Sequence, residues 1–211
     1  MGLGTQRLRS PSTPSSRKSR RRRRTSDAQL RQVTIGPPQR HDAPIELSEY
    51  DAGWAKRFSR ESERIRTALG PRAVRIEHVG STSVSGLCAK PIIDVLLVVA
   101  DSGDERAYVP ALEARGYVLR IREPHWHQHR LLKGPDGEVN LHVFSVGSEE
   151  IDRMLTFRDR LRTDPRAREL YARTKRKLAK RKWKYVQNYA DAKSRVVESI
   201  LAGPRSNVRP S

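Results

Sequence analysis

The feature that most constrains the fold is the stretch from His78 to Val95, in which a Gly/Ser-rich turn joins two strand-like segments. The stretch reads HVGSTSVSGLCAKPIIDV and continues into the apolar run that ends at Val99. A run with so little polar alternation predicts a strand buried on both faces. Because the connection is short, we expect the turn at Gly80-Ser81 to lie near Asp94, the carboxylate within the second strand.

This arrangement is typical of a site for a polyphosphate. Small residues let backbone N–H groups approach an anion, a lysine adds positive charge, and an aspartate can hold Mg²⁺. The sequence therefore predicts Asp94 as a catalytic and metal-binding residue. The predicted phosphate or nucleotide contacts are His78, Gly80, Ser81, Thr82, Ser83 and Lys90.

The remaining pattern predicts an α/β or α+β domain built on one small mixed sheet flanked by helices. Apolar spacing predicts a helix over 54–69, a strand over 74–79 and, after the strand at 92–99, a helix over 104–115. Further strands are predicted at 117–122, 128–133 and 139–146, followed by a helical C-terminal part at 148–162, 165–185 and 189–201.

Charge is concentrated at the N-terminus. The formal net charge of the chain is +19, and residues 1–41 hold eleven Lys/Arg and one acid. Low hydrophobicity with high net charge predicts a disordered basic tail over residues 1–43, before a domain at 44–203 and a short disordered tail at 204–211. The tail is interpreted as a solvated extension or as an arm that binds nucleic acid.

A second basic segment, residues 173–184, has cations nearly all round the predicted helix. It is interpreted either as a solvated helix or as a wall that binds a nucleotide or RNA. Nucleic acid would then be bound through residues 17–24 and 173–184.

No apolar run is long enough to span a membrane, and the single cysteine, Cys88, fits a reducing compartment. We therefore expect a cytoplasmic protein without a membrane partner.

The histidines allow alternatives. His78 and His142 lie on predicted strands that lead to the same cleft, where each either acts as an acid or base or is held by a backbone carbonyl. The spacing of His125, His127 and His129 on an extended segment would place all three on one face, as a solvated loop or a metal site.

The same residues carry a family resemblance. The run from His78 to Val95, together with IELSEYDAGW from Ile45, NLHVF from Asn140, and FRDRLR from Phe157 with Tyr171, resembles the GrpB family over residues 44–201. The resemblance implies a nucleotidyltransferase-like fold, in a family whose domain is also found fused to dephospho-CoA kinases.

The superfamily's site uses a Gly-Ser turn, a strand with two alternating carboxylates, and a carboxylate on a later strand. Here Gly80-Ser81 and Asp94 match, whereas Leu96 stands at the second acidic position and the later strand offers Asn140 and His142. The resemblance therefore implies a Mg²⁺-dependent nucleotidyltransferase with an incomplete carboxylate set. The alternatives are a non-catalytic accessory or folding module and an RNA-binding protein.

Overall fold

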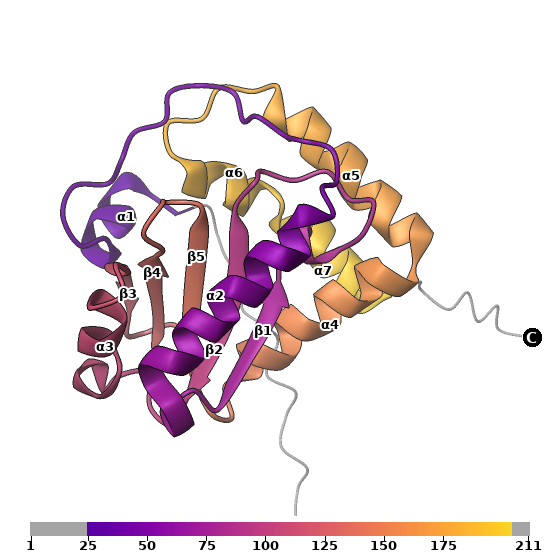
Figure 1. Cartoon of the computed structure of the whole chain (residues 1–211). Coiled ribbons are helices and arrows are strands. Elements are labelled where there is room, and N and C mark those ends of the chain that lie inside the picture. Colours follow the sequence, from indigo (N-terminus) through magenta and orange to yellow (C-terminus); the bar gives the residue numbers. More distant parts are fainter. Residues whose placement is uncertain (1–24, 204–211) are drawn as a thin grey trace, which may run out of the picture.

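A five-stranded mixed sheet forms the centre of the computed structural model, which describes residues 25–203 (Figure 1). Strands β2 and β5 are parallel, and all other neighbours are antiparallel. This confirms the predicted mixed sheet with flanking helices. In spatial order the strands are β1 (Arg75–Val79), β2 (Ile93–Val99), β5 (Val139–Ser145), β4 (His129–Lys133) and β3 (Val118–Glu123).

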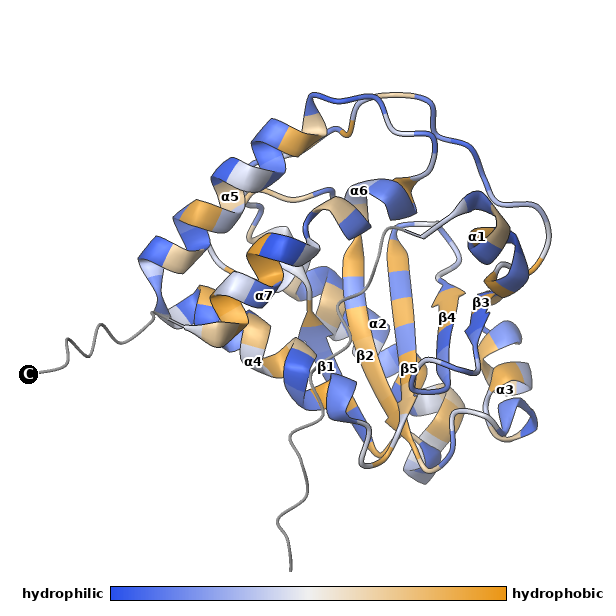
Figure 2. Ribbon diagram, turned by 180° about the vertical axis from the view of Figure 1, so that it is seen from behind, coloured by the Kyte–Doolittle hydropathy of each residue, from blue (hydrophilic) through white to orange (hydrophobic). Residues whose placement is uncertain are grey.

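Helices cover both faces of β2, which explains its lack of polar alternation. Val95 and Leu97 pack in one core with residues of α2 (Gly53–Leu69) and α3 (Val109–Glu113). Leu96 lies on the other face, in a separate core with residues of α4 (Glu149–Thr163). Figure 2 shows β2 hydrophobic along most of its length, whereas hydrophilic residues interrupt β5. Those interruptions are the first indication of a polar site on the sheet.

The C-terminal helices fix the connection between β1 and β2. Helices α4, α5 (Pro165–Ala179) and α7 (Ser194–Ala202) pack against one another. Val84 and Leu87 of the connection are fully buried in the core that these helices form. A 3₁₀ turn over Ser81–Ser83 is the short helix in this connection. The turn that carries Gly80 is therefore held by apolar packing beyond the sheet.

Three predicted helices have different bounds. The helix expected at 165–185 ends at Ala179, because the chain turns so that the Trp183 indole donates to the Leu178 carbonyl and the Trp183 N–H to Ala43. The helix expected at 189–201 is two helices, α6 (Val186–Ala192) and α7. The helix expected at 104–115 is a 3₁₀ turn at Glu105–Ala107 followed by the short α3.

Residues 25–43 differ from the predicted disordered tail. They begin with α1 (Asp27–Val33), which Ser26 and Gln29 cap reciprocally and whose Leu30 is buried. The N-terminal strap, residues 34–41, then runs from a bridge with β3 at Ile121 to the neighbourhood of α6 (Figure 1). One buried leucine and a few backbone hydrogen bonds order a segment whose composition favours disorder.

The predictions for residues 1–24, including the basic run at 17–24, and for residues 204–211 lie outside the described residues. Over residues 25–203, none of the helices combines the length and the hydrophobicity that a membrane span requires.

Candidate functional site

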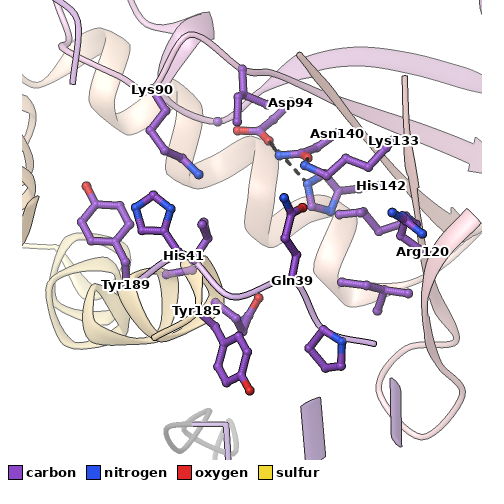
Figure 3. Close-up of a pocket in the computed structure, with 18 of the residues that line it drawn as sticks. Gln39, His41, Lys90, Asp94, Arg120, Lys133, Asn140, His142, Tyr185 and Tyr189 are labelled. Atoms are coloured by element: carbon purple, nitrogen blue, oxygen red, sulfur yellow. Dashed lines mark hydrogen bonds and ion pairs between the residues drawn. The ribbon is translucent and has the colours of Figure 1, made fainter. Parts of the chain in front are cut away.

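A cavity of about 560 Å³ opens beside the start of β2, under the N-terminal strap. Its floor is the row of sheet residues that cross-strand register places side by side, Asp94 on β2, Asn140 on β5 and Lys133 on β4. The strap and α6 form the opposite wall, from which Gln39 extends toward the floor and His41 toward Lys90 (Figure 3). The site is thus built from segments distant in the sequence.

Asp94 is held between Gly80 and the neighbouring strand. The backbone of Gly80 has φ 68° and ψ −169°, a combination that glycine alone adopts without strain. A Cβ at Gly80 would lie 2.9 Å from both Cβ and Cγ of Asp94. The glycine therefore gives the Asp94 carboxylate the space in which it lies, and the predicted proximity of turn and aspartate is confirmed.

The other side of Asp94 makes polar contacts. The Asn140 amide donates to Asp94 Oδ1 at 2.7 Å and accepts at its own oxygen from the Lys133 ammonium at 2.5 Å. His142 Nε2 lies 3.7 Å from the same Asp94 oxygen. Burial raises the pKa of Asp94, but His142, Asn140 and Lys90 outweigh burial and lower it overall. Asp94 is therefore ionised at neutral pH.

Four lysines line the cavity with this carboxylate, of which Lys175 is buried and Lys90, Lys133 and Lys193 are half-buried. Burial lowers the pKa of Lys90 and of Lys133, against the opposing effect of Asp94. Burial also lowers the pKa of Lys175 to about 7 and that of Lys193 to about 8. Lys175, on α5, donates to the Cys88 carbonyl. Such costly desolvation of several cations in one cavity is typical of a functional site.

The lining charge is strongly positive. Of the described residues that line the cavity, Asp94 is the only carboxylate. Six cationic side chains line it as well: Arg40, Lys90, Arg120, Lys133, Lys175 and Lys193. This balance favours an anionic ligand.

The donor set does not fit a metal ion held by protein ligands alone. The described residues contain no group of three or more His, Cys, Asp or Glu side chains arranged for a metal. Asp94 supplies a single carboxylate, whose Oδ1 already accepts a hydrogen bond from Asn140. A resident Mg²⁺ would need several oxygen ligands, in a cavity whose other charged groups repel it.

The structure brings most of the predicted site residues together. Gly80, Ser81, Thr82, Lys90, Asp94 and His142 all line the cavity, whereas His78 and Ser83 do not. The His78 ring is buried, stacks on Phe58 at 4.6 Å and bonds Thr82 Oγ1 at 3.1 Å. Burial lowers its pKa to about 4, so it is neutral at pH 7. Ser83 Oγ donates to the Gly80 carbonyl at 2.7 Å. These two residues support the turn.

The structure also explains Leu96, at the second acidic position. Leu96 pairs in register with His142, but its side chain is fully buried in the core under α4. A carboxylate there would be enclosed by Val79, Phe144 and Leu155. The position at which the sequence resemblance implies a second carboxylate is part of the apolar core.

The three closely spaced histidines do not share a face. His127 and Gln128 both have φ 52°, which turns the chain between β3 and β4. His125 and His127 are exposed, whereas His129 is buried on β4 and bonded to His142. Within residues 25–203 no group of three or more His, Cys, Asp or Glu side chains is arranged to hold a metal, so these three histidines do not form the metal site considered above.

The basic segment at 173–184 has one buried cation. Lys175 is buried and lines the cavity, where its ammonium donates to the Cys88 carbonyl, and the all-round charge pattern gave no sign of this. The other cations of this segment are exposed: Arg173, Arg176, Lys177, Lys180, Arg181, Lys182 and Lys184. The segment therefore has a site-facing lysine and a solvated outer face.

Sequence reasoning missed Lys133, Lys193 and the strap residues Gln39 and His41. Their only signal was charge or polarity within segments assigned to other roles. The missed cations are the larger omission, because they determine the charge of the cavity.

Comparison with known proteins agrees with this architecture. The model of the family described as "GrpB protein" matches residues 44–203. The chain is 60% identical over 176 residues to a UPF0157 protein of Halalkalibacterium halodurans, covering 83% of this chain and 90% of the relative. It is 29% identical over 165 residues to a dephospho-CoA kinase of Mycolicibacterium paratuberculosis, of which the match covers 40%.

One solved structure gives the same assignment. The crystal structure of the conserved protein GrpB from Enterococcus faecalis aligns with a TM-score of 0.64 and 30% identity, covering 74% of this chain and 98% of that one. A structure of Cid1 in complex with its short product ApU aligns with a TM-score of 0.45 and 16% identity, covering 63% and 43%. On the family match and the identity to the Enterococcus faecalis protein, the chain belongs to the GrpB family.

Proposed function

We propose that this protein binds a nucleotide or another phosphorylated ligand in the lysine-lined cavity. The observation that carries the proposal is the charge of the lining, six cations to one carboxylate among the described residues, at the end of the Gly80-Ser81 turn. Desolvated lysines are costly unless an anion compensates them, and phosphate oxygens provide that compensation.

The composition of the lining favours a nucleotide over inorganic phosphate as the ligand. Besides the cations, the lining has apolar side chains, among them Pro37 and Pro38 of the strap and Ile121 and Leu131 of the sheet. A ligand with a charged group and a flat, less polar group matches both parts of such a cavity. A nucleoside phosphate has both.

Nucleotidyl transfer is the reaction that we propose for a bound nucleoside triphosphate. A hydroxyl oxygen would form a bond to the α-phosphorus, and pyrophosphate would leave with the electron pair of the broken P–O bond. The cations of the cavity would stabilise the charge that develops on the phosphates. Release of pyrophosphate is the readout for this step.

Isothermal calorimetry with ATP, GTP, CTP, UTP, CoA and pyrophosphate, with and without Mg²⁺, tests the binding proposal. We expect at least one nucleotide to bind, and to bind more tightly than pyrophosphate. Failure of all six ligands to bind would disprove the proposal.

Asp94→Asn tests the role of Mg²⁺ in the same titration. The substitution removes one negative charge from beside Lys90 and Lys193, so we expect nucleotide affinity to rise several-fold, equally with and without Mg²⁺. Weaker binding confined to the Mg²⁺ titration would instead assign Asp94 to a metal ion that arrives with the nucleotide.

A non-catalytic accessory role is the second candidate. Leu96, buried under α4, removes a carboxylate position, and one relative is named as a dephospho-CoA kinase of which the chain covers less than half. Nucleotide binding without pyrophosphate release for any nucleotide, alone or with RNA as acceptor, would favour this role.

The exposed cations of residues 173–184 support the RNA-binding alternative. If this alternative holds, the affinity of the protein for RNA should fall steeply as the salt concentration rises.

A further inference from the structure

A chain of hydrogen-bonded side chains crosses the sheet and ends at the cavity. On β3, Glu123 Oε2 lies 2.8 Å from His129 Nδ1 on β4, and His129 Nε2 lies 3.1 Å from His142 Nδ1 on β5. His142 lines the cavity, and its Nε2 lies 3.7 Å from Asp94 Oδ1 (Figure 3). Three neighbouring strands thus connect a carboxylate to the site through two imidazoles.

The inner part of this chain is tightly enclosed. Along the chain, the side chains of Glu123, His129 and His142 are 15%, 6% and 21% exposed, so the central imidazole is the most buried of the three. The His129 ring stacks on Phe144 at 4.8 Å and meets Trp126 edge-on at 5.4 Å. These contacts hold both nitrogens of His129 in line with their partners.

The direction of the hydrogen bonds follows from the chemistry of the first partner. An ionised carboxylate only accepts, so Glu123 requires a proton on His129 Nδ1. In a neutral imidazole the other nitrogen is then an acceptor, so His129 Nε2 takes the hydrogen bond from His142 Nδ1–H. This leaves His142 Nε2 with a lone pair that faces the cavity. A proton taken up there gives the charged form of His142, which is the form that lowers the pKa of Asp94, 3.7 Å away.

We propose that Glu123 and His129 are positioning residues that hold His142 in the Nδ1–H tautomer, so that Nε2 accepts a proton from a hydroxyl group in the cavity. The role rests on the nucleotidyl transfer proposed above. The hydroxyl O–H bond breaks, the proton goes to Nε2, and the oxygen keeps the electron pair with which it attacks the α-phosphorus. A carboxylate orients the basic imidazole in the Ser-His-Asp triad by the same principle, here with one imidazole interposed.

Asn140 cannot supply such a base. In the superfamily that the sequence resembles, a carboxylate lies on this later strand, whereas here the Asn140 amide donates to Asp94 and accepts from Lys133. An amide cannot take a proton at neutral pH. His142, two residues further along the same strand face, can do so.

Nitrogen-15 NMR of histidine-labelled, ligand-free protein tests the proposal. In the full chain at pH 8 we expect His142 to show a protonated Nδ1 and an unprotonated Nε2, the opposite of the tautomer that an unconstrained imidazole favours. His129→Phe preserves the ring contacts and removes the acceptor, so His142 should change to the Nε2–H tautomer and donate toward Asp94. The exposed His125 is the internal control and should not change.

Glu123→Gln provides a second, milder variant, in which the fraction of the His142 Nδ1–H tautomer should fall while the amide spectrum stays dispersed. An Nε2–H tautomer of His142 in the wild type, a doubly protonated His129, or an unchanged His142 in His129→Phe would overturn the proposal. These nitrogen signals are read without ligand, so a failure to bind nucleotide would be seen only in the calorimetry.

Discussion

Replacing both Lys90 and Lys193 by methionine should weaken nucleotide binding by roughly 100-fold or more, because each lysine contributes a desolvated charge to the same anion. A hydrogen bond from a charged group in a protein is worth about 1.5 to 3 kcal/mol, and 1.4 kcal/mol is about tenfold in affinity. Calorimetric titration with the nucleotide that binds most tightly to the wild type measures the effect.

The same double variant should retain or gain thermal stability. Burial lowers the pKa of both lysines, so their charged forms are disfavoured in the folded protein, and an apolar side chain of similar length removes that cost. Weakened binding in a protein with an unchanged or higher melting temperature separates loss of the site from loss of the fold.

The matched control is Lys180→Met with Lys182→Met, two exposed cations of the basic segment. This variant should change nucleotide affinity by less than about twofold, since exposed charges are screened by solvent and salt. A control variant that weakens binding as much as the cavity variant would locate the anion on the outer surface and contradict the proposed site.

Gly80→Ala should destabilise the protein by roughly 3 kcal/mol and abolish nucleotide binding. A non-glycine residue in this backbone region costs about 1 to 3 kcal/mol, and here the new methyl group also overlaps the Asp94 carboxylate. Either the turn or Asp94 must move, and both line the cavity. Urea unfolding measures the stability, and calorimetry measures the binding.

Gly86→Ala is the matched control within the same connection. Its φ is 74°, but a Cβ there would have nothing within 4 Å. We expect a loss of about 1 kcal/mol from the backbone conformation alone, with nucleotide affinity unchanged. Equal losses of stability and affinity in both variants would show that Asp94 does not need the space beside Gly80.

The sequence predicted the parts of the site that are close together along the chain. Gly80, Ser81, Lys90 and Asp94 come from one strand–turn–strand unit, whose short connection leaves little freedom in how its ends meet. The apolar run around Asp94 likewise predicted a strand covered on both faces. Local connectivity and hydrophobic pattern are sufficient for such features.

The rest of the site depends on cross-strand register and on helix packing. Asn140 and Lys133 meet Asp94 because two ladders bring them into one row, and a shift of one residue would reverse their faces. Lys175 is one of many cations in its segment, and only the packing of α5 against the β1–β2 connection makes it the buried one. Neither the strand register nor the packing of α5 can be derived from a single amino-acid sequence.

The boundaries that sequence reasoning misplaced have a common cause. Composition assigned residues 25–43 to a disordered tail, although Leu30 and backbone hydrogen bonds to Arg120 and Lys184 hold this segment on the domain. Likewise, the helix predicted at 165–185 ends at Ala179 in the structure, because the backbone of Trp183 pairs with that of Ala43. Long-range contacts of a few residues override local preference in both places.

Proton uptake on nucleotide binding at pH 8 tests the central claim most directly. With a pKa of about 7, Lys175 is mostly neutral at this pH, and Lys193, with a pKa of about 8, is half protonated. A bound phosphate favours the charged form and raises both pKa values, so binding should take up roughly one proton. Calorimetry in two buffers of different ionisation enthalpy measures this number. Uptake that falls in Lys175→Met is the predicted result, whereas tight binding without proton uptake would contradict a ligand site among these lysines.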